Sequence, residues 1–422
     1  MFVHLVLASN RRWAHPTFLF GPWNSSVQRR WKKPVISARS RLENRTLDPK
    51  LDNLMTKYRK LRVVLKLHEI MSKRPAALHV SVEMLTRWKN IVGLNVRVGD
   101  YLRRSPHIFQ VYPHPVRKYP CCRMTRKMRD LINDEERVRR EQKSTAVAKL
   151  KKLLMMSISG SSLHVHSAWL VRRELGLPDN FRKSILSQHP QVFVMVSSEI
   201  VKLISRDNTL AVAQVEKWRE KEYREKWLSE FETKHAFPIQ FPTGFRMGKG
   251  FREKMRNWQR LQYLHPYDKP EIGKEVAIRA KTCGGPRRYE KRAVAIIHEL
   301  LSMTVEKMMT VERLAHFRSD LSLKVNVRDV LLDHPGIFYI STKANVQTVF
   351  LREAFDKGYL VNGQQDPIYR ARWRMLELVS LGRRITRCPM PLQQVGTSVD
   401  DKVSVPVSSN RDRIISMLLS CS

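Results

Sequence analysis

The chain has 422 residues, of which 78 are Lys or Arg and 39 are Asp or Glu, so its formal net charge is +39. A freely diffusing metabolic enzyme with this excess would bind every polyanion it met, and the usual partner of such a charge is a phosphate backbone. Hydrophobic residues make up 42% of the chain and aromatic residues 8%, which excludes a wholly disordered basic tail. The composition therefore predicts a folded protein whose partner is nucleic acid.

The first 42 residues form a distinct segment, because the first acidic residue of the chain is Glu43. They contain eight basic residues among scattered bulky apolar ones, a pattern typical of organelle transit peptides. A secretory signal fits less well, since the apolar run from Phe2 to Ala8 is short and follows no basic region. We expect residues 1–42 to be a transit peptide whose arginine pairs favour the mitochondrion, with the chloroplast as the alternative. The rest of the chain keeps a net charge of +31.

A four-residue motif occurs three times. It consists of a proline, any residue, an isoleucine or valine, and a phenylalanine, in that order. The flanks match at similar offsets: a valine lies 24 to 26 positions upstream of each proline, and an apolar run ending in arginine lies downstream. Matching flanks indicate true internal repeats rather than chance. The sequence predicts three repeats, over about residues 60–128, 146–208 and 293–354. The shared residues are Pro106, Pro190 and Pro335, Phe109, Phe193 and Phe338, Val80, Val165 and Val311, and Arg126, Arg206 and Arg352.

Each repeat is predicted to contain three helices followed by two strands. Apolar residues at helical spacing, among them Leu85, Trp169 and Leu314, indicate the helices. The proline ends the third helix, because it disfavours helical geometry in the residue before it and cannot continue the hydrogen-bond ladder. The residues after it are β-branched and aromatic and favour an antiparallel hairpin packed on the helices. The expected fold class is α+β, predominantly helical, with three winged-helix-like repeats.

Residues 215–289 form a basic helical insertion between repeats two and three. Its first half predicts a long charged helix, and its second half turns through Pro238, Pro242 and Gly244 into another helix. On this second helix, Phe251 and Trp258 share one face with other apolar residues, whereas basic residues occupy the opposite face. Residues 384–422 have no apolar periodicity and are predicted to be a disordered tail.

Several ordered motifs resemble one known family. They are residues 244–261, His265-Pro-Tyr267, His298-Glu-Leu-Leu301, residues 334–341 and residues 348–354. Together with Asp48-Pro49 they resemble the plant organelle RNA recognition (PORR) domain over about residues 46–381. Two mild departures are Ala344, where that family commonly has Gly, and Phe355, where Tyr is usual. The resemblance implies a nuclear-encoded land-plant protein of mitochondria or plastids that binds RNA, promotes splicing of group II introns and has no catalytic residues.

Two sets of basic residues are candidates for RNA contact. The first set occupies one position of the repeat, where an arginine could contact phosphate or could instead cap a carbonyl or pair with the next helix. The second set lies in the insertion, where it could bind RNA or form a solvated helix face. The first set is Arg126, Arg206 and Arg352, and the second is Arg246, Lys249, Arg252, Lys254, Arg256 and Arg260.

No catalytic, cofactor or metal site is predicted. The pairs His68-Glu69 and His298-Glu299 begin like a zinc-protease motif, but serine replaces the second histidine, so both pairs are expected at helix surfaces. The five cysteines lack a CxxC spacing, which argues against a zinc ribbon or a disulfide framework. No segment approaches the roughly 20 apolar residues of a membrane span, so no membrane partner is expected.

The expected function is binding and organising organellar intron-containing RNA without catalysis, with other splicing factors as further candidate partners. Two alternatives share the charge and the targeting. One is a structural or assembly factor of the organellar ribosome. The other is a transcription termination factor-like binder, whose closely spaced tandem repeats match poorly with prolines 84 and 145 residues apart.

Overall fold

The computed structural model describes residues 38–73, 80–158, 160–226, 233–268, 285–323 and 325–385. Helices dominate these residues, and the strands form three three-stranded sheets and one two-stranded sheet, all antiparallel. The fold is therefore α+β and mainly helical, as predicted. Most of the predicted transit peptide, up to residue 37, and the predicted tail after residue 385 lie outside the described residues.

Helix α2 (Pro49–Ser72) opens repeat one. Asp48 caps its first turn, since the Asp48 side chain accepts hydrogen bonds from the backbone amides of Lys50 and Leu51, and Pro49 stands where a helix needs no amide hydrogen. Apolar residues at helical spacing, including Met55 and Leu67, are buried along one side. The remaining elements of repeat one are β1 (Val80–Ser81), α3 (Val82–Arg87), α4 (Lys89–Val92), α5 (Val98–Arg103), β2 (Phe109–Pro113) and β3 (Pro120–Met124).

Repeats two and three have the same order of elements, except that turns replace the equivalent of α4 in repeat three. Repeat two contains α7 (Lys143–Met156), β4 (Ser162–His164), α8 (Val165–Leu170), α9 (Arg172–Leu175), the π-helical turn η1 (Arg182–Leu186), β5 (Phe193–Met195) and β6 (Ile200–Leu203). Repeat three contains α14 (Gly285–Met303), β7 (Met308–Thr310), α15 (Val311–His316), α16 (Val327–Asp333), β8 (Phe338–Ser341) and β9 (Thr348–Leu351). In every repeat the third strand lies between the other two.

The predicted hairpins are present as β2–β3, β5–β6 and β8–β9. The sequence analysis missed the first strand of each sheet, because β1, β4 and β7 are only two or three residues long and carry no alternating pattern of their own. The helical segment before each shared proline, which is α5, η1 or α16, ends two to four residues ahead of it. Each repeat also has a left-handed residue at one equivalent position: Gly93, Gly176 or Ser322.

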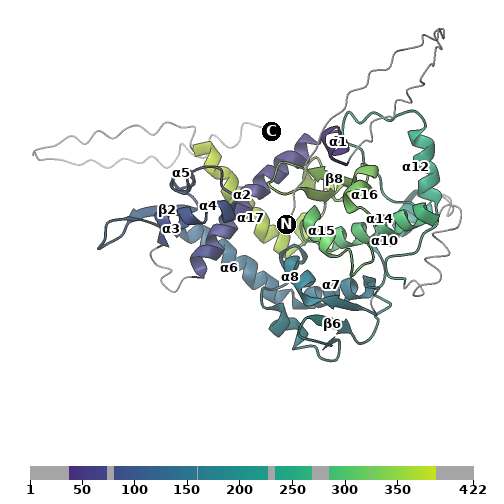
Figure 1. Ribbon diagram of the computed structural model, residues 1–422, viewed down its shortest axis with the longest axis horizontal. Coiled ribbons are helices and arrows are strands. Elements are labelled where there is room, and N and C mark those ends of the chain that lie inside the picture. The colour runs from purple at the N-terminus through teal and green to yellow at the C-terminus, as the bar shows by residue number, and fades with distance from the viewer. Residues whose placement is uncertain are drawn as a thin grey trace, which may run out of the picture.

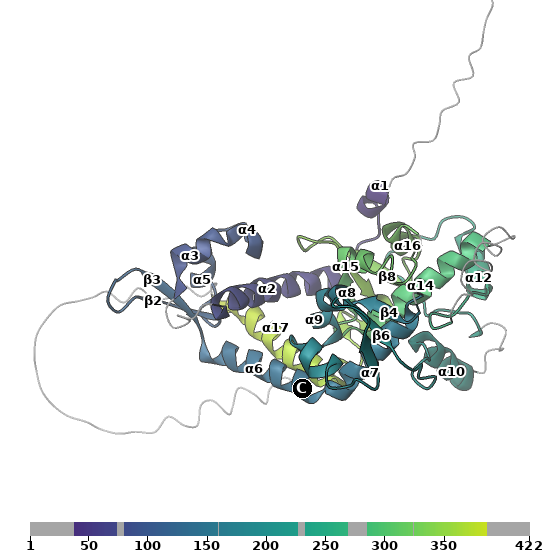
Figure 2. The same cartoon turned by 60° about the horizontal axis from the view of Figure 1, so that its bottom comes forward.

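Repeat three is the centre of the molecule. Its Met308, Tyr339 and Phe350 belong to the apolar core that contains α2 and repeat one, whereas most of its other buried residues join the core of repeat two and the insertion. Both strands of its hairpin are buried throughout. Figures 1 and 2 show repeat one at one end of the molecule and the insertion, with α10 (Gln214–Lys226) and α12 (Phe251–Arg260), at the other.

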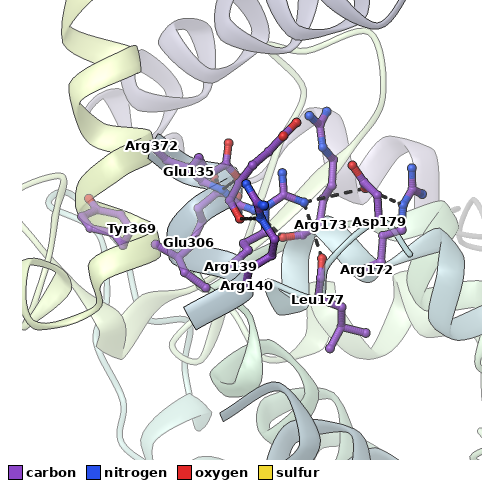
Figure 3. Close-up of polar contacts among 12 residues, drawn as sticks. Glu135, Arg139, Arg140, Arg172, Arg173, Leu177, Asp179, Glu306, Tyr369 and Arg372 are labelled. Atoms are coloured by element: carbon purple, nitrogen blue, oxygen red, sulfur yellow. Dashed lines mark hydrogen bonds and ion pairs between the residues drawn. The ribbon is translucent and has the colours of Figure 1, made fainter. Parts of the chain in front are cut away.

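A buried ion network joins the linking helix α6 (Arg126–Glu141) to the C-terminal helix α17 (Pro367–Ile385) (Figure 3). Glu135 Oε1 lies 2.8 Å from Arg372 Nε and 3.3 Å from Arg139 Nε, and Glu135 is only 1% exposed. Burial alone would raise the pKa of Glu135, but the guanidinium groups of Arg372 and Arg139 hold it below its ordinary value. Arg372 also lies 3.3 Å from Glu306 and donates to the carbonyl of Arg173, so this network connects α6 and α17 to repeats two and three.

The residues just before α2 pack against repeat three. Helix α1 (Ala38–Glu43) packs on α16, and its Arg41 forms ion pairs with Asp329 and Asp333. Arg45 Nε donates a hydrogen bond to the carbonyl of Ile340 at 2.7 Å. The last residues of the predicted transit peptide, 38–42, thus contact the folded domain. The segment β10 (Phe355–Asp356) to β11 (Tyr359–Leu360) forms a small hairpin before α17.

Candidate nucleic-acid interface

Helix α12 presents the densest group of exposed basic side chains predicted from the sequence. It begins after Gly250, whose φ of 73° is a left-handed conformation that glycine adopts without strain. The helix and the turn before it contain one acidic residue, Glu253, against six basic ones. Figures 1 and 2 show α12 at the outer edge of the molecule. All six predicted residues are exposed: Arg246, Lys249, Arg252, Lys254, Arg256 and Arg260.

The opposite face of α12 packs on repeat three. The Trp258 ring is tilted against the ring of His334, with 4.5 Å between centroids, and Phe251 and Met255 line a cavity of about 220 Å³ together with Phe241. The backbone of residue 240 donates to the carbonyl of Gly336 at 2.8 Å. A Cβ at Gly336 would lie 2.5 Å from Ile239, so only glycine allows this close approach. The amphipathic pattern predicted for this helix is therefore confirmed.

Lys291 fixes the C-terminal end of α12. Its Nζ is fully buried and donates to the carbonyl oxygens of Trp258, Gln259 and Leu261 at 2.7–2.8 Å, which satisfies the orphan carbonyls of the last turn. Burial, followed by the charge of Arg219, lowers the pKa of Lys291 to about 6. The three carbonyl dipoles and the ring of Trp258, 4.8 Å away, oppose that shift because they favour the ammonium form.

The basic side chains of this segment remain available for a ligand. Within the described residues, no ion pair or hydrogen bond engages Arg246, Lys249, Arg252, Lys254 or Arg256, whereas Arg260 has a contact of its own. Exposed cations along a helix and the turn before it suit the phosphates of a polyanion and position it without reading base identity. We call these six residues the α12 basic face.

The three arginines at the shared repeat position do not form one line of contacts. Arg126 at the start of α6 is exposed, and Arg206, just beyond β6, is exposed as well. Arg352 is only 5% exposed, its Nη1 lies 2.9 Å from Asp48 Oδ2, and its guanidinium lies 4.9 Å from the ring centroid of Tyr339. Arg352 therefore holds the start of α2 on repeat three, which is a pairing with a distant element and not with the next helix along the chain.

Replacing Arg352 with Ala is expected to lower the free energy of unfolding by about 3 kcal/mol, because it leaves the Asp48 carboxylate without its buried partner. Arg126→Ala and Arg206→Ala are the matched controls, since exposed substitutions usually change stability by less than about 0.5 kcal/mol. Urea unfolding followed by circular dichroism measures all three. Equal stability of the three variants would contradict the buried role of Arg352.

The hairpin of repeat one carries basic residues that the sequence analysis did not single out. Arg123 on β3 donates to Gln110 across the strand pair at 2.9 Å, and its guanidinium lies 5.2 Å from the ring centroid of Tyr112. Arg117 and Lys118 in the turn are exposed. Alternation of basic and aromatic residues from Tyr112 to Arg123 was the available signal. This hairpin lies at the opposite end of the molecule from α12 (Figure 1).

The histidine and glutamate pair of α14 has a structural role. His298 and Glu299 are buried, so the prediction that they lie at the helix surface was wrong. His298 Nε2 lies 2.8 Å from Glu353, and Glu299 accepts hydrogen bonds from Tyr267 and from the backbone of Gln214. Among the described residues no three potential metal ligands converge, and no helix there is both long and apolar enough to span a bilayer.

Fold and surface together define a basic α+β protein built from three internal repeats, with a cationic helix on its rim. A family model for the plant organelle RNA recognition domain matches residues 46–384. The chain belongs to this family, and the resemblance in the sequence is thereby confirmed. No solved structure matches it significantly.

Three curated relatives show how far the similarity extends. The chain is 36% identical over 374 residues to Protein ROOT PRIMORDIUM DEFECTIVE 1 of Arabidopsis thaliana, covering 86% of this chain and 89% of that protein. It is 32% identical over 355 residues to Protein WHAT'S THIS FACTOR 1, chloroplastic, of Zea mays, covering 82% and 68%. It is 26% identical over 344 residues to Protein WHAT'S THIS FACTOR 9, mitochondrial, of Arabidopsis thaliana, covering 79% and 83%.

Proposed function

We propose that this protein binds organellar intron-containing RNA without catalysing a reaction and promotes splicing of group II introns. The observation that carries the proposal is the α12 basic face, in which five cations have no partner among the described residues. Membership of a family defined by organelle RNA recognition supports the class of ligand. Other splicing factors are further candidate partners.

The proposed mechanism follows from the charge of the RNA. A self-splicing intron must collapse into a compact fold against the repulsion of its own phosphates, and it must avoid mispaired states. A rigid cationic surface neutralises phosphates and holds chosen segments in place. Because the major groove of A-form RNA is too narrow for side chains, sequence would be recognised at unpaired bases. The intron itself supplies the transesterification chemistry.

We also propose that each repeat is a winged-helix-like unit. Its elements follow the order helix, strand, two or three helical segments and hairpin, and the third strand lies in the middle of the sheet. The three units would not contact RNA equally. The third helix of repeat three, α16, lies beneath α1, and its hairpin is buried, so the exposed hairpins of repeats one and two remain for binding.

We propose the mitochondrion as the destination, on the arginine pairs of the N-terminal segment, with the chloroplast as the alternative. The curated relatives include one named mitochondrial and three named chloroplastic. A transit peptide would end before Ala38, because Arg41 and Arg45 bind repeat three in the folded domain. Removing these residues would uncover Asp329 and Asp333 on α16.

A salt titration tests the RNA-binding part of this proposal. With a group II intron transcript as probe, the logarithm of the association constant is expected to fall linearly with the logarithm of salt concentration, with a slope of about −0.7 for each phosphate neutralised. The six cations of the α12 basic face would therefore contribute about −4 to the slope. Filter binding at several potassium concentrations measures it. A flat response would contradict binding through the basic face.

A further inference from the structure

Helix α8 of repeat two exposes two aromatic side chains. Trp169 is 43% exposed, although its place in the apolar pattern of the sequence suggested a packing role, and His166 one turn earlier is exposed as well. Their rings are stacked with 5.9 Å between centroids and 18° between planes. The guanidinium of Arg172 lies 4.1 Å from the centroid of the Trp169 ring. These three planar groups form a row along the surface, which we call the α8 row.

Comparison with the other repeats shows that the side chains of this row are not part of the hydrophobic core. Three equivalent helices, α3, α8 and α15, begin at Val82, Val165 and Val311. In each repeat the residue with left-handed backbone geometry lies eleven positions after that valine, so the three segments can be aligned without gaps. The residues buried at the fourth helical position are Leu85, Ala168 and Leu314. The solvent-facing positions filled by His166 and Trp169 in repeat two are filled by Glu83 and Thr86 in repeat one and by Glu312 and Ala315 in repeat three. Only repeat two has aromatic side chains at both positions, and only repeat two lacks the glutamate at the first of them.

A cavity of about 730 Å³ adjoins the row. It lies between α8 and η1, and its rim includes His164, Arg182 and Lys183. Arg182 and Lys183 are exposed, and Arg182 donates to the carbonyl of Ser198 at 2.6 Å, which holds its guanidinium at the rim. Two carboxylates also line the cavity: Asp179, which is paired with Arg172 at 3.0 Å, and the exposed Glu199.

We propose that the α8 row and this cavity bind an unpaired nucleobase of single-stranded RNA, with the adjoining phosphate beside Arg182 and Lys183. The proposal rests on the RNA-binding function proposed above and specifies the form of RNA that repeat two recognises. Unpaired bases stack on aromatic rings and guanidinium planes, whereas bases in a duplex cannot reach them. Three cations, Arg172, Arg182 and Lys183, outnumber the two carboxylates there, and this polar site favours nucleic acid over the apolar surface of a protein partner.

Binding of a fluorescent single-stranded oligoadenylate and of an RNA duplex of equal length to the full chain tests this proposal. Trp169→Thr introduces the residue of repeat one and is expected to weaken binding of the single strand about 5- to 100-fold. Duplex affinity and the salt slope should stay the same, because no phosphate contact is removed. His166→Glu should also weaken binding of the single strand. The matched control is Tyr223→Thr on α10, which removes another exposed aromatic side chain, 51% exposed, and should leave both affinities unchanged.

Three outcomes would overturn the proposal. Unchanged single-strand affinity of Trp169→Thr, while the wild-type chain binds RNA with a steep salt slope, would remove the stacking site and leave the RNA-binding function intact. Equal losses on single strand and duplex would show that the row does not select unpaired bases. Failure of the wild-type chain to bind either RNA would refute the RNA-binding function itself. Ultraviolet cross-linking of the wild-type chain gives an assay independent of variant folding, and the cross-linked peptide is expected to contain Trp169.

Discussion

Reversing the charges of Arg252, Arg256 and Arg260 together to Glu is expected to weaken binding to intron RNA at least about 100-fold at low salt. Each exposed contact between a cation and a phosphate is worth about 1 kcal/mol at 4 Å in water, so losing three of them accounts for this factor before any repulsion is added. The salt slope should become shallower by about 2, because three fewer phosphates are neutralised. Filter binding at several salt concentrations measures both quantities.

The matched control changes the same three residues to Lys, which keeps the charge and loses only the fork geometry of the guanidinium. This variant should retain nearly the full salt slope. Since all three side chains are exposed, both variants should unfold at the same urea concentration as the wild-type chain to within a few tenths molar. Unchanged affinity of the Glu variant would assign the α12 basic face to solvent.

Replacing Glu135 with Ala is expected to cause the largest loss of stability, about 3–5 kcal/mol. The substitution leaves the guanidinium groups of Arg139 and Arg372 buried without their shared carboxylate, and the two like charges would then repel one another (Figure 3). Because the network joins α6, α17 and repeat three, the repeats should also come apart more easily. Urea unfolding measured with the full chain gives the change.

Glu136→Ala is the control for this prediction, since Glu136 is the next residue of the same helix and is exposed. It should change the free energy of unfolding by less than about 0.5 kcal/mol. Glu135→Gln keeps the shape but not the charge and should lie between the two. A Glu135→Ala variant as stable as Glu136→Ala would show that the network contributes nothing to the fold.

The parts of the structure that local chemistry determines could be predicted from the sequence. The hairpins follow from prolines that end the third helices and from the β-branched and aromatic residues after them. The two faces of α12 follow from helical periodicity, because Phe251, Met255 and Trp258 recur at its spacing. These features depend on residues close together in the chain.

The parts that depend on distant contacts could not be predicted. Arg352 looks like Arg126 and Arg206 in the sequence, but its partner Asp48 lies 304 positions away. The burial of His298 and Glu299 depends on Tyr267 and Glu353, which belong to other elements. Trp169 sits in an apolar pattern and is nevertheless exposed, because Ala168 fills the core position instead. Strands of two or three residues are too short for periodicity to reveal.

Sequencing the RNA that co-purifies with the tagged full-length protein from isolated organelles tests the proposed function most directly. The variant with Glu at positions 252, 256 and 260 serves as the background. The wild-type chain is expected to enrich transcripts that contain group II introns, with reads concentrated in the introns and lost in the variant. Enrichment of ribosomal RNA alone, or RNA recovery equal to that of the variant, would contradict a role in intron splicing.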